Sequence, residues 1–418
     1  MGESFNYNGN MDTEIWLPRP KYLDKVRKFY GTNLIKVFLG QRRVGKSGLL
    51  HLVMDDWKAS GFDGSVLFVD KEKREWNRIG TGDELLAEAH AMDVRPGTRN
   101  LILVDEIQEI RDFAPAIRSL SAEGKYDLFV TGSNARLLSG EIATSFSGRA
   151  ITFRVHPLSY AEYLDFHHRS DSDESLLRYL RYGGLPYLAA LPDIDTVLVQ
   201  YLDAIVDTVV LRDVVERFGV RNTIFLRNLV SFCADSVGSL LSAKRIADYL
   251  KSRHLKVSTQ VVIDYLGHLA AAFLVNRCRR FDIQGRRLFE IGEKLYFGDL
   301  GLRTAIRGFF QQDLAKVIEN AAYLKLLQDG WDVNVGAWEN REIDFVATRG
   351  EDRVYVQVSL TVLDEKTRQR EFGNLLGIDD NFPKYVVSMD TIRANERGIQ
   401  HLGLREFLLA ELGSQVTM

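Results

Sequence analysis

The sequence predicts an α/β protein whose N-terminal part is a parallel sheet covered by helices. Five short, apolar and largely β-branched runs alternate with helical stretches, which is the pattern of parallel strands joined by helical crossovers. They cover residues 34–40, 64–70, 100–110, 127–134 and 150–156. A glycine-containing turn joins the first run to residues 46–57, where apolar side chains recur at helical spacing.

The turn after the first predicted strand carries a phosphate-binding pattern. Residues 40–47 fit GxxxxGK(S/T), in which glycines let backbone amides surround phosphates at a helix N-terminus. Lys46 would neutralise β- and γ-phosphate oxygens, and Ser47 would ligate Mg²⁺. Arg42 and Arg43 either flank the phosphates or face solvent. The residues expected to bind ATP are Gly40, Gln41, Arg42, Arg43, Val44, Gly45, Lys46, Ser47 and Gly48.

A pair of acids ends the third predicted strand, about 60 residues after the loop. Alone, Asp105 and Glu106 would more often cap a helix, but beside a phosphate loop they fit a Walker B element. Asp105 would hold Mg²⁺ through water, and Glu106 would polarise the attacking water. The fourth predicted strand ends in Asn134, which either contacts the γ-phosphate or the water, or only satisfies backbone groups.

Several segments together resemble one protein family. The segments GQRRVGKS, LVDEIQ, TGSN, GRAITFRVHPLSYAEYL and RYGGLPYL are similar to those of AAA-type (AAA+) ATPases of bacteria and archaea that end in a domain of unknown function. The resemblance implies the AAA+ fold with a helical lid, Asn134 as the polar sensor and Arg149 as an arginine finger. A finger acting on a neighbouring subunit requires a homo-oligomer, for example a hexamer. Arg136 competes for this role, and either arginine could instead pair with surface acids.

The middle of the chain predicts a winged helix. Two helices at 242–252 and 258–275 precede strand-like segments around a glycine turn in 276–303. Such a wing either lies along a DNA phosphate backbone or packs against protein. The candidate DNA contacts are Arg277, Arg279, Arg280, Arg286 and Arg287.

The last third resembles the core of restriction-endonuclease-like nucleases. A helical Glu319, a hairpin carrying Asp344 and a strand carrying Gln357 follow the carboxylate and (D/E)xK pattern, in which two carboxylates share a metal. Gln357 stands in place of the second carboxylate, and Ser359 replaces the lysine. Lys366 or Lys384 could supply the missing cation only if the fold brings one of them near. We therefore expect this fold without cleavage.

Composition limits the partners. The 418 residues are 45% hydrophobic with a formal charge of −3, so a sizeable core is available and any nucleic-acid site must be local. Cys233 and Cys278 lack CxxC spacing, which argues against a disulfide framework and a structural zinc site and favours the cytoplasm. The longest apolar stretch, 266–275, is far shorter than the ~20 residues that span a bilayer.

These observations predict four domains and two possible functions. The domains are a nucleotide-binding domain at 1–160, a helical lid and linker at 161–232, a winged helix at 233–303 and a nuclease-like domain at 304–418. One function is an oligomeric ATP- and Mg²⁺-dependent motor or remodeller acting on DNA. The other is a switch that hydrolyses ATP slowly and binds protein partners according to nucleotide state.

Overall fold

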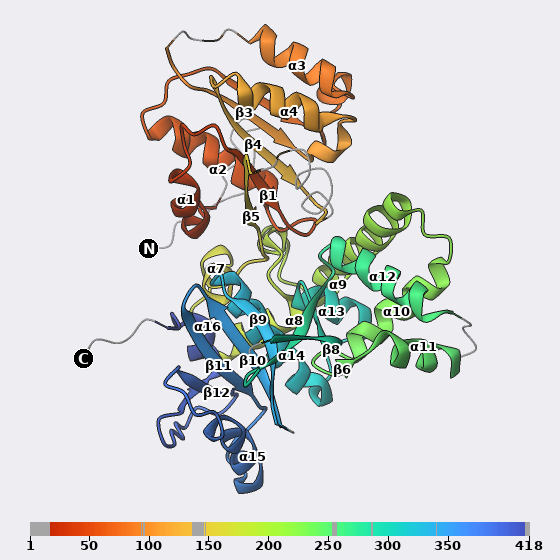
Figure 1. The fold of residues 1–418 in the computed structure, drawn as a ribbon, viewed down its shortest axis with the longest axis vertical. Helices are drawn as coiled ribbons and strands as arrows, with labels where there is room; N and C mark the ends of the chain where they lie inside the picture. Colours follow the sequence, from red (N-terminus) through yellow and green to blue (C-terminus); the bar gives the residue numbers. More distant parts are fainter. Residues whose placement is uncertain are drawn as a thin grey trace. The chain divides into compact units, whose positions relative to one another are not determined.

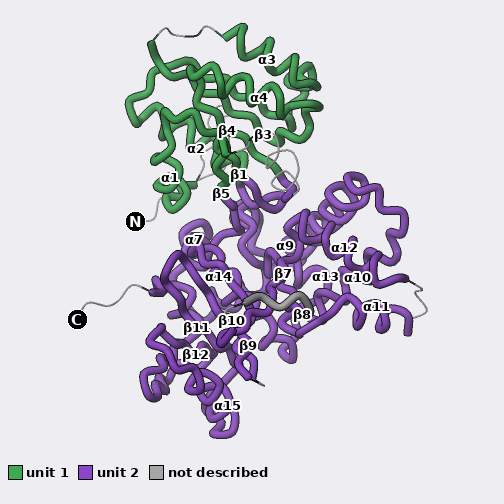
Figure 2. Tube along the Cα trace, in the orientation of Figure 1, with its two compact units in different colours: residues 1–38, 46–132, 140–153 green, residues 39–45, 133–139, 154–418 purple. Residues whose placement is uncertain are grey.

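The computed structural model describes residues 17–92, 94, 97–135, 146, 148–252, 257–285, 287–339 and 341–413, without the side chains of 287–291. The chain forms two compact units, coloured separately in Figure 2. Unit 1 comprises residues 1–38, 46–132 and 140–153, and unit 2 comprises residues 39–45, 133–139 and 154–418. The chain thus forms two compact bodies where the sequence predicts four domains, because the segments expected to be lid, winged helix and nuclease-like domain share one unit.

Unit 1 is built on a five-stranded parallel sheet in the order β2-β3-β4-β1-β5, which confirms the predicted α/β class. Its strands are β1 Ile35–Leu39, β2 Val66–Asp70, β3 Asn100–Asp105, β4 Tyr126–Gly132 and β5 Ala150–Arg154. Its helices are α1 Pro20–Arg27, α2 Lys46–Ala59, α3 Gly82–Ala91 and α4 Phe113–Ala122, with 3₁₀ turns at Arg74–Arg78 and Ile107–Glu109. Figure 1 shows α1 and α2 on one side of the sheet and α3 and α4 on the other.

The burial of the strands follows from this order. Every residue of β1, β3 and β4 is buried, whereas the edge strands β2 and β5 are partly exposed. Parallel strands covered by helices on both faces need apolar side chains in both directions, which the continuous apolar runs supply. Because β3 and β4 run parallel, their carboxyl ends lie at the same edge of the sheet. This edge carries the acids of unit 1's candidate site.

Unit 2 contains an eight-stranded sheet in the order β13-β12-β11-β10-β9-β7-β8-β6. Its strands are β6 Leu240–Leu241, β7 Val275–Asp282, β8 Arg287–Phe297, β9 Asp332–Trp338, β10 Arg341–Arg349, β11 Asp352–Val358, β12 Lys384–Ser388 and β13 Gln400–Gly403. The helices are α7 Tyr160–Phe166, α8 Asp173–Tyr182, α9 Asp195–Thr208, α10 Thr223–Asp235, α11 Ala243–Ser252, α12 Thr259–Ala271, α13 Leu300–Arg307, α14 Leu314–Gln328, α15 Glu365–Leu376 and α16 Leu404–Leu409. A π-helix, Val209–Glu216, continues α9, and 3₁₀ turns occur at Pro186–Ala190 and Gln311–Asp313.

The predicted wing is part of this larger sheet. Helices α11 and α12 precede the antiparallel hairpin of β7 and β8, in the expected order. However, β7 also pairs in parallel with β9, so the hairpin is continuous with the strands of the last third. The predicted boundary at residue 303 therefore separates segments that share one sheet.

The glycine pair after α8 is held against the N-terminus of α13. Gly184 N–H donates to Asp299 Oδ2 at 2.8 Å, and Leu302 N–H donates to Asp299 Oδ1 at 3.1 Å. Gly183 has a φ of 75°, and a Cβ there would lie 2.4 Å from Asp299 Oδ1. A glycine is needed at 183 for both reasons. Asp299 is thus both the N-cap of α13 and the anchor of the segment that follows α8.

We expect Asp299 to make the protein less stable as pH rises from about 4 to about 6. Burial raises the pKa of Asp299 to about 6, above its usual value of 3.8, although the backbone donors oppose this shift. The folded state therefore binds more protons than the unfolded state in this window, and the free energy of unfolding falls as pH rises, by roughly 3 kcal/mol. Urea unfolding at pH 4 and pH 6.5 measures the fall.

The matched control is Asp299→Asn, which keeps an oxygen acceptor at the N-cap but does not titrate. The pH-dependent loss of stability should be smaller in this variant by the contribution of Asp299. Equal losses in the variant and the wild type would contradict the role assigned to this carboxyl.

Candidate nucleotide site and a C-terminal polar cluster

The turn from β1 to α2 has the backbone that the phosphate-binding pattern requires. A Cβ on Gly40 would lie 2.2 Å from the carbonyl oxygen of Val155, so only glycine fits there. Gly45 has a φ of 89° and Arg43 a φ of 70°, both in the left-handed region. Helix α2 begins at Lys46, so this turn lies at a helix N-terminus, where an anion is favoured.

In unit 1, the two metal-ligand candidates lie together. The Ser47 hydroxyl hydrogen-bonds to Asp105, and the Thr131 hydroxyl donates to Asp105 Oδ1. Burial raises the pKa of Asp105 above its usual value, and these two hydrogen bonds oppose the shift. A hydroxyl and a carboxylate at a buried strand end are oxygen ligands suited to Mg²⁺, so the residues present fit this ion.

Glu106 is fixed by its neighbours in the same unit. It has a φ of 52°, and its N–H donates to Thr131 Oγ1 at 2.8 Å. Its carboxylate lies 3.7 Å from Lys46 Nζ and accepts a hydrogen bond from Gln108. A non-glycine residue in the left-handed region is a strained conformation that is concentrated at functional sites. Thr131 therefore positions both acids, a role that its place at the end of a strand does not by itself indicate.

The remaining predicted residues of the loop and strand ends belong to unit 2. Arg42 is buried, and its Nε lies 3.2 Å from Oδ2 of the buried Asp213 on the π-helix, so it does not face solvent. Arg43 is exposed. Asn134 is buried two residues after the end of β4, and the neighbouring Ser133 hydroxyl lies 3.5 Å from Arg217 Nη1.

Of the two candidate arginine fingers, the structure describes only Arg149. Arg149 is an exposed residue in unit 1 just before β5, and its carbonyl accepts the Ile35 N–H at 2.8 Å. Its side chain is therefore at the surface while its backbone is fixed to the sheet. Arg136 lies outside the described residues.

The arginines of the predicted wing differ in exposure and in ion pairing. Arg277 forms an ion pair with Glu293 across the β7–β8 hairpin, with Nε 2.9 Å from both carboxylate oxygens. Arg279 is exposed and Arg280 is half-buried. Arg286 and the side chain of Arg287 lie outside the described part of the chain.

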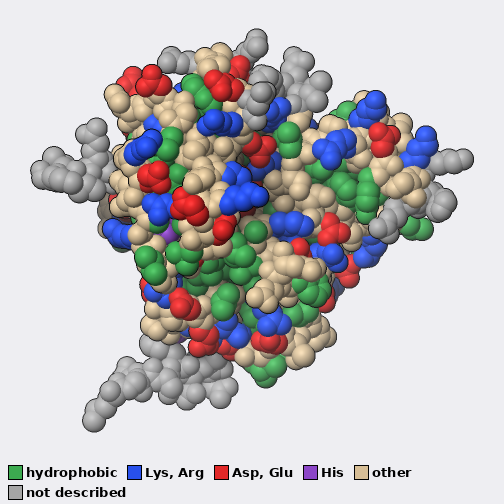
Figure 3. All heavy atoms as spheres, turned by 90° about the horizontal axis from the view of Figure 1, so that it is seen from below, with side chains coloured by type: hydrophobic (Ala, Val, Ile, Leu, Met, Phe, Trp, Pro, Cys, Tyr) green, Lys and Arg blue, Asp and Glu red, His purple; other side chains and the backbone are tan. Residues whose placement is uncertain are grey.

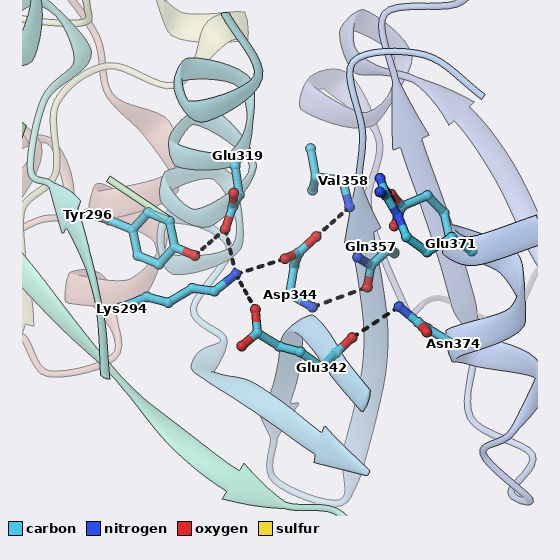
Figure 4. A network of polar contacts seen from close by, with 10 residues as sticks. Lys294, Tyr296, Glu319, Glu342, Asp344, Gln357, Val358, Glu371 and Asn374 are labelled. Atoms are coloured by element: carbon cyan, nitrogen blue, oxygen red, sulfur yellow. Dashed lines mark hydrogen bonds and ion pairs between the residues drawn. The ribbon is translucent and has the colours of Figure 1, made fainter. Parts of the chain in front are cut away.

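Unit 2 brings together the three residues predicted from the nuclease-like pattern (Figure 4). Glu319 comes from α14, Asp344 from β10 and Gln357 from β11. Gln357 Oε1 accepts the N–H of Asp344 at 3.2 Å. Burial and the neighbouring Asp344 carboxylate raise the pKa of Glu319 to about 7. The three positions therefore lie close together in the fold, as the sequence pattern predicts.

The cation in this cluster is not one of the lysines predicted from the sequence. Lys294 of β8 lies 2.9 Å from Glu319 and 2.8 Å from Asp344, whereas Lys366 is exposed and Lys384 contacts Asp380. Burial alone would lower the pKa of Lys294, but the carboxylates around it raise the pKa well above its usual value. Lys294 reaches the cluster because the β7–β8 hairpin joins the same sheet as β9 and β10.

Glu371 also adjoins this cluster and is not predicted by the sequence pattern. It lies on α15, is buried, and its carboxylate accepts a hydrogen bond from the Gln357 side chain.

Among the described residues, no group of three or more His, Cys, Asp or Glu side chains has an arrangement that could hold a metal ion. None of the helices in the described ranges is long and apolar enough to cross a membrane.

The strand order of unit 1, the loop before α2 and the polar ends of β3 and β4 define a P-loop ATPase of the AAA type. Residues 32–164 match a family model described as an AAA domain, and residues 173–313 match a domain of unknown function, DUF8612. The resemblance of the N-terminal motifs to AAA-type ATPases is thereby confirmed.

An uncharacterized protein of Haemophilus influenzae is 32% identical over 387 residues, which cover 90% of this chain and 94% of that protein. This chain belongs to the same family. An uncharacterized protein of Methanocaldococcus jannaschii is 28% identical over 387 residues, covering 88% of this chain and 84% of that protein. Among solved structures, a Walker-type ATPase of Pyrococcus abyssi matches 70% of this chain and 96% of its own, with a TM-score of 0.50 and 15% identity, which shows similarity of fold alone.

Proposed function

We propose that this protein is an oligomeric AAA+ ATPase that hydrolyses ATP to move or remodel DNA. The observation that carries the proposal is the group of side chains, in unit 1, at the start of α2 and at the carboxyl end of β3. Ser47 and Asp105 hydrogen-bond to each other, and Glu106 lies 3.7 Å from Lys46. These are the positioning and charge-neutralising groups on which phosphoryl transfer depends.

The residues of this group have distinct tasks in the proposed reaction. Mg²⁺ held by Ser47 and Asp105 would neutralise negative charge on the phosphates. The ammonium of Lys46 would exchange its contact with Glu106 for β- and γ-phosphate oxygens. Glu106 would then be free to orient the attacking water and accept its proton. Asn134 is assigned the role of polar sensor by the resemblance to AAA-type ATPases.

Substitution of Arg149 tests the proposed oligomer. The arginine is exposed, so it is available to a neighbouring subunit's γ-phosphate. Arg149→Ala should lower steady-state ATP hydrolysis by about 10³-fold or more, the effect typical of a lost arginine finger. A mixture of Arg149→Ala and Glu106→Gln chains should regain hydrolysis, because each variant supplies the group that the other lacks. Wild-type activity in Arg149→Ala, or no recovery on mixing, would contradict a finger acting between subunits.

The DNA part of the proposal is supported by the helix-helix-hairpin order of α11, α12, β7 and β8, which we interpret as a winged helix. Arg277 and Arg279 are exposed arginines of this hairpin, and Arg277 is paired with Glu293. ATP hydrolysis should be stimulated by one of three forms of DNA, single-stranded, duplex or branched, and the stimulation should fall between 50 and 200 mM salt. Arg279→Ala should weaken the stimulation without changing hydrolysis in the absence of DNA.

A nucleotide-controlled switch that binds protein is the second candidate, and the contact between Arg42 and Asp213 favours it. This ion pair joins the phosphate loop to the π-helix within unit 2. A conformational change in the loop would therefore be transmitted to the helical region. Arg277 is already paired with Glu293, and basic and acidic side chains are interspersed on the face drawn in Figure 3. Slow hydrolysis that is indifferent to every form of DNA would support the switch.

A further inference from the structure

The polar cluster of unit 2 has a cation of its own. The ammonium of Lys294 lies 2.9 Å from Glu319, 2.9 Å from Glu342 and 2.8 Å from Asp344. Its side chain is 3% exposed. An ammonium has three N–H donors, and here each donor has a carboxylate within reach (Figure 4).

Four oxygens that a divalent metal could use already have other partners. Asp344 Oδ1 contacts Lys294, and Asp344 Oδ2 accepts the N–H of Val358 at 3.0 Å. Glu319 Oε1 accepts from Lys294 and also from the Tyr296 hydroxyl at 2.6 Å. The amide oxygen of Gln357 accepts the Asp344 N–H.

The resemblance to metal-dependent nucleases implies a divalent ion at Glu319 and Asp344, and the residues present do not fit one. A dication among these carboxylates would stand beside a buried positive charge, and like charges in a buried site repel strongly.

We propose that Lys294 replaces the divalent metal in this cluster. Its ammonium holds the carboxylates of α14 and β10 together and thereby excludes Mg²⁺ and Mn²⁺. The last third of the chain is then a nuclease-like scaffold stabilised by an internal ion pair, and the site that would bind metal opens only when Lys294 is removed. This inference does not depend on the ATPase activity proposed for unit 1.

Binding of Mn²⁺, followed by electron paramagnetic resonance, tests the proposal. The measurements use the full chain without nucleotide, with Asp105→Asn present throughout to remove the candidate metal position of unit 1. Lys294→Met should bind one Mn²⁺ per chain at least tenfold more tightly than the Lys294 protein, and adding Asp344→Asn should abolish this binding. Lys325→Met is the matched control, because Lys325 is also buried in unit 2 and paired with a carboxylate, that of Asp329. It should gain no Mn²⁺ site.

Two results would overturn the proposal: Mn²⁺ binding by the Lys294 protein that Asp344→Asn removes, or binding by Lys294→Met that is no tighter than in the Lys294 protein. Lys294→Met could also fail to fold, because it leaves several carboxylates buried without a cation. In that case either Mn²⁺ or the second substitution Asp344→Asn should restore folding, as judged by circular dichroism. Failure of both to restore it would show that Lys294 has a packing role only.

Discussion

Glu106→Gln is expected to lower steady-state ATP hydrolysis by about 10²–10⁴-fold while leaving nucleotide binding nearly unchanged. The amide cannot accept the proton of the attacking water, but it has almost the same shape as the carboxylate. The contact with Lys46 also loses its charge, so Lys46 becomes more available to phosphates. Release of phosphate from ATP measures the loss, and fluorescence titration with a labelled ATP analogue measures binding.

Gln108→Ala is the control for this substitution. It removes the hydrogen bond to Glu106 but leaves the carboxylate in place, so hydrolysis should fall far less than in Glu106→Gln. Equal hydrolysis by Glu106→Gln and the wild type would contradict the assignment of Glu106 as the base.

Asp127→Ala is expected to lower the free energy of unfolding of unit 1 by about 3–5 kcal/mol. Asp127 of β4 and Lys36 of β1 form an ion pair in which both side chains are fully buried. The same carboxylate accepts the indole N–H of Trp57 at 2.9 Å and the backbone N–H of Gly31 at 2.8 Å. Removing it leaves a buried ammonium, the buried indole N–H of Trp57 and the part-buried N–H of Gly31 without this acceptor. Burial already lowers the pKa of Lys36.

Urea unfolding followed by circular dichroism measures this loss, and Glu88→Ala is the matched control. Glu88 also forms an ion pair in unit 1, with Arg78, but both side chains are partly exposed, so its removal should have little effect. If Asp127→Ala were no more destabilising than Glu88→Ala, the buried ion pair would not be a main support of unit 1.

The sequence predicts unit 1 well because its signals are local. A continuous apolar run, a glycine-rich turn and a helix of regular spacing are each contained in a few residues, and β1 and α2 begin within one residue of the predicted positions. The convergence of Ser47 and Asp105 follows once the strands are known to be parallel. The contribution of Thr131 does not, because it depends on β4 lying next to β3 in the sheet.

Unit 2 could be predicted only in parts, because its key contacts join residues that are distant in sequence. Lys294 belongs to a hairpin that the sequence assigns to a wing, and nothing local indicates that β7 pairs with β9. The partner of Arg42 is 171 residues away, in a helix without any recognisable motif. Patterns of hydrophobicity give the elements, whereas the pairing of strands decides which polar side chains meet.

Calorimetric titration of the wild type and Lys46→Ala with ATP and Mg²⁺ would show whether the loop before α2 holds ATP. We expect saturable binding of one ATP per chain to the wild type and binding at least tenfold weaker to Lys46→Ala, since the buried ammonium would no longer neutralise the phosphates. Equal affinity in the two proteins, or no binding to either, would contradict it.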